Sequence, residues 1–334
     1  MKTNKLMQLI SVTAASTLAL AACSSTPTTA STTTGNTSKI TVTASMYPIE
    51  YLVNEISGGK VAVNELTAPG ASAHDAEVSP ADVSAIEKTQ AMIYIKGFSA
   101  AIDDAASNVS IKPVVNIGDS VQLLTAKQLG PNAESEDHDH DSAAKDADHD
   151  HKAEGHDHAH GDFDPHFFTD PSRMALAVAP VVKTLSEVDP ANADTYKANG
   201  EKLTAKLDEL AKKFSAALNP QKCQSTTFVV THQAFGYLAD KNKLSQVGIA
   251  GLDPDVEPSP ARVKEVTDIM KKSGTNVIFA TSDSEKKGAE AVAKETGATV
   301  MLLDPAVSQK DKSKDYIAVM EQNLDLLKGA MKCK

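Results

Sequence analysis

Short apolar runs rich in β-branched residues alternate with segments of helical periodicity from residue 40 to the end of this 334-residue chain. The runs predicted as strands are Ile40–Ala44, Val61–Leu66, Ala91–Ile95, Pro113–Ile117, Thr226–Thr231, Asn276–Ala280 and Thr299–Leu303. Strands that alternate with helices pair in parallel, because each helix carries the chain back to the start of the next strand. The alternation therefore predicts an α/β protein with mainly parallel sheets.

A repeated motif divides the chain into two halves. Residues 77–81 read Glu-Val-Ser-Pro-Ala and residues 257–261 read Glu-Pro-Ser-Pro-Ala. In both, Ser-Pro is a helix start, with serine as the cap and proline in the first turn. Each helix leads into a predicted strand, so the same unit occurs once in each half. The repeat predicts two lobes, an N-terminal lobe at 39–188 and a C-terminal lobe at 220–334.

A long amphipathic stretch connects the two predicted lobes. Asp189 and Pro190 provide a helix start, and apolar residues then recur at helical spacing. These apolar residues are Tyr196, Leu203, Leu207, Leu210, Phe214 and Leu218. The pattern predicts a rigid linking helix over 189–219, roughly 40 Å long at 1.5 Å per residue. Two shorter helices broken at Gly200 are the alternative.

The first 38 residues are typical of an export segment and a tether. Residues 1–22 carry a basic start and an uncharged run too short to span a membrane, which predicts a signal peptide. The run ends Leu-Ala-Ala-Cys23 and resembles the lipobox of bacterial lipoproteins, in which the cysteine is lipidated; a chance cysteine is the alternative. Residues 23–38, mostly serine and threonine, predict a lipid-anchored flexible linker. We therefore expect an extracytoplasmic protein anchored to a bacterial membrane through Cys23, on the cell surface or the periplasmic side.

Two cysteines remain after Cys23. Cys223 lies at the start of the C-terminal lobe and Cys333 is the penultimate residue. An exported protein occupies a compartment that permits disulfides, and an even number of cysteines there predicts a bridge. Two free buried thiols are the alternative.

The composition changes abruptly between residues 134 and 164. This segment contains 12 acidic and two basic residues, so it carries −10 of the chain's formal net charge of −11. It has almost no apolar residues, which predicts a disordered loop within the N-terminal lobe. Its histidines are His138, His140, His149, His151, His156, His158 and His160. Imidazole and carboxylate together predict weak, exchangeable binding of Zn²⁺ and similar cations, and a solvated acidic spacer is the alternative.

The same composition argues against nucleic acid as a partner. The chain is acidic, with a pI near 5.4, whereas proteins that bind nucleic acids carry basic surfaces. It has no tryptophan and only 4% aromatic residues, so it offers few platforms for stacking bases or sugars.

Three histidines lie outside the acidic segment. His74 precedes the first Ser-Pro helix start, His166 follows the acidic segment, and His232 follows the predicted strand Thr226–Thr231. Ligands of open α/β sheets bind beyond the carboxyl ends of strands, and two of these histidines hold such positions. We therefore predict that the three form one metal site.

A fourth ligand is expected from the C-terminal lobe. Asp304 follows the predicted strand Thr299–Leu303 and is the predicted ligand. Its competing role is a helix cap or an Asx turn before the proline that follows. The alternatives for the fourth position are Glu77, Asp253, Asp283 or water.

Four motifs carry a resemblance to a known family. They are Pro-Gly at 69–70 with His74 and Ser-Pro at 79–80; Asp-Pro-His at 164–166 with Asp-Pro at 170–171; Thr-His-Gln-Ala-Phe-Gly-Tyr-Leu at 231–238; and Leu-Asp-Pro at 303–305. With these motifs the chain resembles the zinc-binding solute-binding lipoproteins of ABC metal-uptake transporters, a cluster that includes manganese receptors and adhesin-type lipoproteins. The resemblance implies two lobes, a rigid linking helix, and a metal site in the cleft between the lobes.

The resemblance also implies a role for each site residue. His74, His166 and His232 match the three histidine ligands of the family, and Asp304 matches an acidic position that some members use. Some zinc-binding members have an acidic ligand where this chain has Ala73, and manganese-type members have glutamate at position 232. Histidine at that position, together with the His-rich loop, therefore favours zinc.

The expected function is capture of Zn²⁺ outside the cytoplasm, by a monomer, and its delivery as the transported ligand to an ABC permease with its ATPase. A manganese receptor and an adhesin or metal-buffer lipoprotein of the same fold are the alternatives. A zinc-dependent hydrolase is less well supported, because the chain has no HExxH motif and no clear nucleophile with a base. We expect no enzyme activity.

Overall fold

The computed structural model describes residues 39–129, 163–255 and 257–334. The predictions for the signal peptide, for lipidated Cys23 and for the linker concern residues outside this part of the chain. The seven histidines of the acidic segment also lie outside the described residues.

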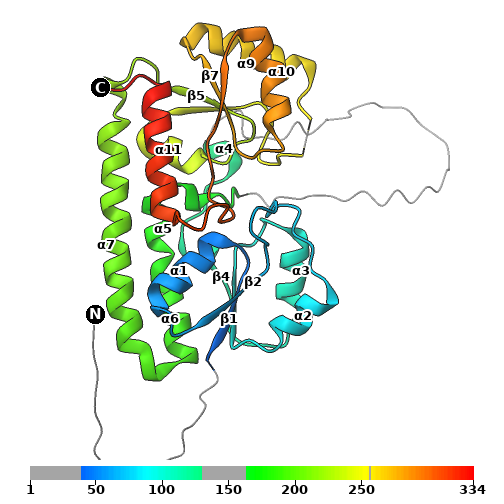
Figure 1. Ribbon diagram of the computed structural model, residues 1–334, viewed down its shortest axis with the longest axis vertical. Coiled ribbons are helices and arrows are strands. Elements are labelled where there is room, and N and C mark those ends of the chain that lie inside the picture. Colours follow the sequence, from blue (N-terminus) through cyan, green and yellow to red (C-terminus); the bar gives the residue numbers. More distant parts are fainter. Residues whose placement is uncertain (1–38, 130–162, 256) are drawn as a thin grey trace, which may run out of the picture. The chain divides into compact units, whose positions relative to one another are not determined.

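The N-terminal lobe is built on a parallel sheet of four strands in the order β2-β1-β3-β4. The strands are β1 (Thr41–Ala44), β2 (Ala62–Glu65), β3 (Ala91–Tyr94) and β4 (Val114–Asn116). The helices α1 (Tyr47–Ser57), α2 (Pro80–Ile86) and α3 (Ala100–Asn108) connect them (Figure 1). The predicted parallel arrangement is confirmed for this lobe.

The C-terminal lobe repeats the same topology, with a parallel sheet in the order β6-β5-β7-β8. Its strands are β5 (Thr227–Val230), β6 (Ser245–Gly248), β7 (Val277–Ala280) and β8 (Thr299–Leu302). Its helices are α8 (Gly236–Asn242), α9 (Pro260–Ser273) and α10 (Lys286–Thr296). Sequence patterns missed β6, because its sequence Ser-Gln-Val-Gly has a single large apolar residue. The repeat could have indicated it, since β6 holds the place that β2 holds in the first lobe.

The two Ser-Pro motifs begin equivalent helices. Ser79 caps α2 in a reciprocal capping box with Asp82, and Ser259 caps α9 by accepting a hydrogen bond from the backbone N–H of Arg262. Both helices connect the second strand of their sheet to the third. The sequence repeat is therefore a structural repeat as well.

The predicted linking helix is continuous. A short 3₁₀ helix at Pro190–Asn192 leads into α7 (Ala193–Ala217), which runs unbroken through Gly200. A Cβ atom on Gly200 would lie 2.5 Å from Cγ2 of Val182 in α6 (Val178–Val188), so glycine allows the two helices to approach closely. The break considered at Gly200 is absent because this glycine serves helix packing.

Helix α7 packs against elements of both lobes. It contacts α1, α5 (Pro171–Leu176) and α6 of the N-terminal lobe, and the C-terminal helix α11 (Tyr316–Ala330) of the other lobe (Figure 1). One apolar core joins buried residues of both sheets and of α7, and each lobe adds a smaller core of its own. At the centre, the Tyr316 hydroxyl donates a hydrogen bond to the Phe168 carbonyl oxygen at 2.6 Å. Among the described helices, none combines the length and apolar character needed to cross a bilayer.

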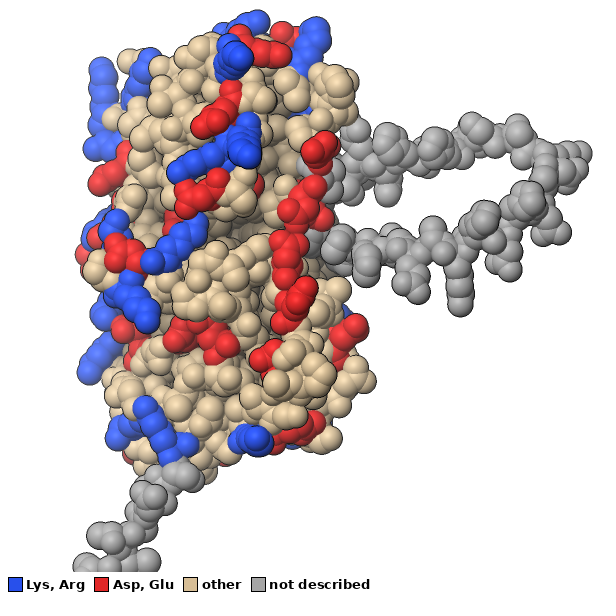
Figure 2. All heavy atoms as spheres, turned by 45° about the vertical axis from the view of Figure 1, so that its right-hand side comes forward, with Lys and Arg blue, Asp and Glu red and all other residues tan. Residues whose placement is uncertain are grey.

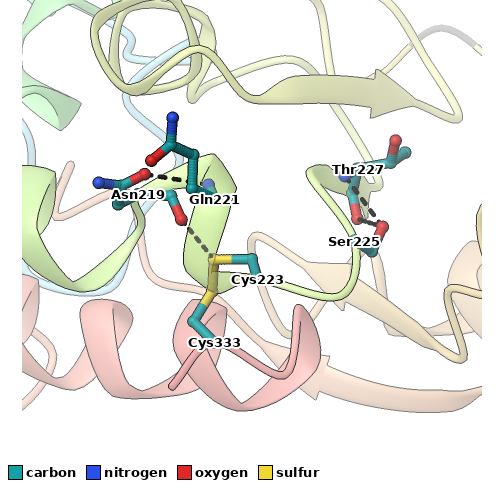
Figure 3. Close-up of a disulfide and its surroundings, with 6 residues drawn as sticks. All are labelled: Asn219, Gln221, Cys223, Ser225, Thr227 and Cys333. Carbon is teal, nitrogen blue, oxygen red and sulfur yellow. Dashed lines mark hydrogen bonds between the residues drawn. A yellow bond between two sulfur atoms is a disulfide. The ribbon is translucent and has the colours of Figure 1, made fainter.

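Cys223 and Cys333 are joined by a disulfide (Figure 3). Cys223 follows the 3₁₀ helix Pro220–Lys222, and Cys333 follows α11. Backbone hydrogen bonds flank the bridge, from the Lys334 N–H to the Lys222 oxygen and from the Gln224 N–H to the Met331 oxygen. The bridge therefore fastens the end of the C-terminal helix to the segment that enters β5.

Candidate metal centre

His74, His166 and His232 converge on one point between the lobes. Each offers one ring nitrogen, and the three nitrogens lie within 4.8 Å of one another. The Nε2 atoms of His74 and His166 are 3.1 Å apart. Within residues 39–129, 163–255 and 257–334, this is the one group of His, Cys, Asp and Glu side chains with such a spacing. Histidines separated by up to 158 positions in the sequence are thus brought to one place, as the sequence analysis expects.

The N-terminal lobe supplies His74 on the long connection between β2 and α2. Its side chain is half-buried, and its ring stacks on Phe98 with the ring centroids 4.2 Å apart. The ring of His232 meets it edge-on at 5.7 Å. Phe98 therefore forms an apolar wall that restricts how the first imidazole can turn.

His166 is fully buried just before the short 3₁₀ helix Phe167–Thr169. Asp164 Oδ1 lies 2.7 Å from its ring Nδ1 and also accepts a hydrogen bond from its backbone N–H at 2.8 Å. Tyr237 in α8 donates its hydroxyl hydrogen to the carbonyl oxygen of Asp164, and accepts one from the N–H of Leu124. A carboxylate at Nδ1 is the usual partner of a metal-binding imidazole, since it orients the ring and leaves Nε2 for the metal.

His232 belongs to the C-terminal lobe and lies beyond the end of β5, with 4% of its surface exposed. Its Nδ1 is 2.6 Å from Thr281 Oγ1 and 3.2 Å from Glu285 Oε2. Burial opposes ionisation of Glu285, but the hydrogen bond and electrostatic attraction of His232 and the hydroxyls of two threonines lower the pKa of Glu285 to about 2. Thr281 and Glu285 were not predicted as site residues, because no local motif ties them to a histidine about 50 positions earlier.

Asp304 is not part of the histidine group in this structure. Its Oδ1 accepts a hydrogen bond from the Ala306 N–H at 2.8 Å, which is the Asx turn considered as its competing role. Burial is the main cause that raises the pKa of Asp304. Asp283, another alternative, pairs with Lys286 at 2.6 Å, while Asp253 accepts a hydrogen bond from the Asp255 N–H.

A pair of carboxyl groups also lies near His74. Asp75, next to His74, lies beside Asp255 of the other lobe. Burial, followed by the neighbouring carboxyl group of Asp75, raises the pKa of Asp255 to about 6. A column of acidic side chains crosses the face turned forward in Figure 2. Negative charge of this kind attracts cations and repels anions.

The chemistry of the group suits a borderline divalent cation. Three neutral imidazoles make a tetrahedral Zn²⁺ site when a fourth ligand or water joins them, and manganese prefers sites richer in oxygen. Two ligands come from one lobe and the third from the other, so the geometry of the site depends on how the lobes pack together.

Comparison with known families gives a decisive match. The profile of the family described as "Zinc-uptake complex component A periplasmic" matches residues 42–330, which is nearly all of the chain that the structure describes. The chain belongs to this family. Its two α/β lobes are therefore those of this family.

Individual relatives agree with the family. The zinc-binding protein AdcA of Streptococcus pyogenes is 32% identical over 295 residues, which cover 87% of this chain and 56% of the relative. This chain thus spans little more than half the length of AdcA. The high-affinity zinc uptake system protein ZnuA of Bacillus subtilis is 29% identical over 303 residues and matches 89% of both chains.

A solved structure shows the same fold. The laminin-binding protein Lmb of Streptococcus agalactiae, described as a bifunctional protein with adhesin and metal-transporting activity, superimposes with a TM-score of 0.71 at 26% identity. The match covers 87% of this chain and 99% of Lmb.

Proposed function

We propose that this chain captures Zn²⁺ outside the cytoplasm and delivers it to an ABC permease for high-affinity zinc uptake. The observation that carries the proposal is the convergence of His74, His166 and His232, with both lobes contributing. Family membership and zinc-binding relatives support zinc as the transported ligand.

The proposed ligands are the three imidazoles and Asp304. The Asx turn uses one carboxylate oxygen of Asp304, and the side chain would have to move for a carboxylate oxygen to join the histidine group. We therefore expect Asp304 to contribute less to zinc affinity than any of the three histidines, with water as the competing fourth ligand.

The chain is proposed to act as a binding protein and not as an enzyme. The carboxylates of Asp164 and Glu285 contact His166 and His232 at ring Nδ1. They orient the ligands there, whereas a hydrolase would need a base directed at a metal-bound water.

The remaining partners follow from the same proposal. The permease and its ATPase accept the ion, and the chain works as a monomer held at a bacterial membrane through lipidated Cys23. Because the ligands come from both lobes, docking on the permease can release zinc by changing how the lobes pack.

Growth under zinc limitation tests the proposal in the cell. Cells that lack this chain should grow slowly when zinc is chelated, and added zinc should restore growth while added manganese should not. A copy of the wild-type chain should restore growth as well, and a copy with His166→Ala should fail. Restoration by manganese in preference to zinc would identify the chain as a manganese receptor instead.

The seven histidines of the acidic segment are proposed to collect zinc near the main site. We expect that deleting residues 134–162 leaves the zinc affinity of the histidine group unchanged. Uptake at scarce zinc should fall by up to about tenfold, because a charged, metal-exchanging segment raises the local cation concentration. The control replaces the segment with glycine and serine of equal length, and zinc-uptake rates are measured from scarce to ample zinc. Equal uptake by all three proteins at every zinc concentration would show that the segment has no such role.

A further inference from the structure

Glu285 is the centre of a hydrogen-bond network that joins the ends of two strands. It lies just before α10 with 13% of its side chain exposed, and the partners of its carboxylate are His232, Thr231, Thr281 and Ser282. Thr231 follows β5, and Thr281 follows β7. A carboxylate so nearly buried needs such donors to offset the loss of water, and here each donor comes from a residue at the site.

Counting hydrogens in this network fixes the tautomer of the neutral His232 ring. A carboxylate only accepts hydrogen bonds, so Thr281 must donate its single hydroxyl hydrogen to Glu285, from which its Oγ1 lies 2.7 Å. Thr281 Oγ1 can then only accept from His232 Nδ1, 2.6 Å away. The direct contact between Nδ1 and the Glu285 carboxylate, which also only accepts, likewise requires a hydrogen on Nδ1. Nδ1 therefore carries a hydrogen, and in the neutral ring Nε2 is then the nitrogen with the lone pair that a metal requires.

The network also fixes where the ring points. His166 is oriented by Asp164, two residues away on the same segment, but His232 is held by groups 49 and 53 residues further along the chain. Its ring is thereby tied to the turn between β7 and α10. Since His232 is the single histidine that the C-terminal lobe contributes to the group, its orientation decides whether the two lobes can share one ion.

We propose that Glu285, acting through Thr281, is a positioning residue for zinc binding that holds the His232 ring in the tautomer and orientation needed for Nε2 to bind the metal. This inference rests on the proposed zinc function. It assigns to Glu285 a contact with the ligand His232 and none with the metal ion. Loss of such an outer partner typically weakens metal binding about 10–100-fold.

The main test is Glu285→Gln, which keeps the shape of the side chain and removes its charge. We expect the zinc dissociation constant to rise about 10–100-fold. With Co²⁺ in place of zinc, the visible absorption bands should shift, because they report the arrangement of the ligands around the metal. Glu290→Gln is the matched control, since Glu290 is an exposed residue of α10, the helix that Glu285 precedes, and it should change neither quantity.

A second variant covers the case in which Glu285→Gln does not fold. Thr281→Val keeps the side-chain shape and removes the hydroxyl between the imidazole and the carboxylate, so zinc binding should weaken about 3–10-fold, the value of one hydrogen bond. Wild-type zinc affinity and an unchanged Co²⁺ spectrum in the folded variants would overturn the inference and leave the zinc function intact. Failure of the wild-type chain to bind zinc would instead contradict the proposed function itself.

Discussion

Replacing His232 with alanine should weaken zinc binding by at least about 100-fold, equivalent to roughly 2.7 kcal/mol. His232 is the one histidine from the C-terminal lobe in the group, so its loss leaves two imidazoles on one lobe and no nitrogen ligand on the other. A site confined to one lobe would hold the ion more weakly and would no longer depend on the packing of the lobes. Competition of the purified chain with a zinc-binding dye gives the dissociation constant.

The control for this substitution is His149→Ala, the same change within the acidic segment. It should leave the tight site intact, because His149 is not one of the three histidines proposed to form that site. The free energy of unfolding of the metal-free proteins shows whether His232→Ala has damaged the fold. A folded His232→Ala protein that binds zinc as tightly as the wild type would remove this residue from the site.

Replacing both bridged cysteines, Cys223→Ser with Cys333→Ser, should lower the free energy of unfolding by about 2–4 kcal/mol. The bridge joins residues 110 positions apart, and it therefore restricts a long loop of the unfolded chain. It also fastens the end of α11, whose first residue, Tyr316, is hydrogen-bonded to the segment that carries His166. Urea unfolding of the metal-free chain measures the effect without the stabilisation that bound zinc would add.

The reductant response provides the control for the disulfide. Reduction should destabilise the wild-type chain by a similar amount and leave the double variant unchanged, since Cys23 is the same in both proteins. If the double variant and the wild type unfold at the same urea concentration, the bridge contributes nothing to the stability of the lobe.

Local patterns predicted most of the fold because the elements follow local rules. Apolar β-branched runs and Ser-Pro caps depend on neighbours in the sequence, and they located every strand except β6. That strand is polar, and only its pairing beside β5 makes it a strand. At Gly200 the local pattern suggested a helix break that does not occur. The glycine is needed there because Val182 of the neighbouring helix approaches closely.

The histidine group was predictable and the residues around it were not. The three histidines stood apart once the acidic segment was recognised, and strand ends indicated where they would meet. Thr281 and Glu285 reach His232 only through the pairing of β5 with β7, which no local pattern reveals. Asp304 was correctly placed after β8, but its carboxylate forms an Asx turn in the structure, and its role as a ligand stays a prediction.

The central claim is that one tight site formed by His74, His166 and His232 selects zinc. The direct test is equilibrium titration of the purified chain with Zn²⁺ and with Mn²⁺, using a variant in which the seven histidines of the acidic segment are replaced by asparagine. We predict one tightly bound Zn²⁺ per chain and an affinity for Mn²⁺ lower by at least about 100-fold, because three imidazole ligands favour zinc. Binding of Mn²⁺ as tight as that of Zn²⁺, or the absence of a tight zinc site in this variant, would contradict the account.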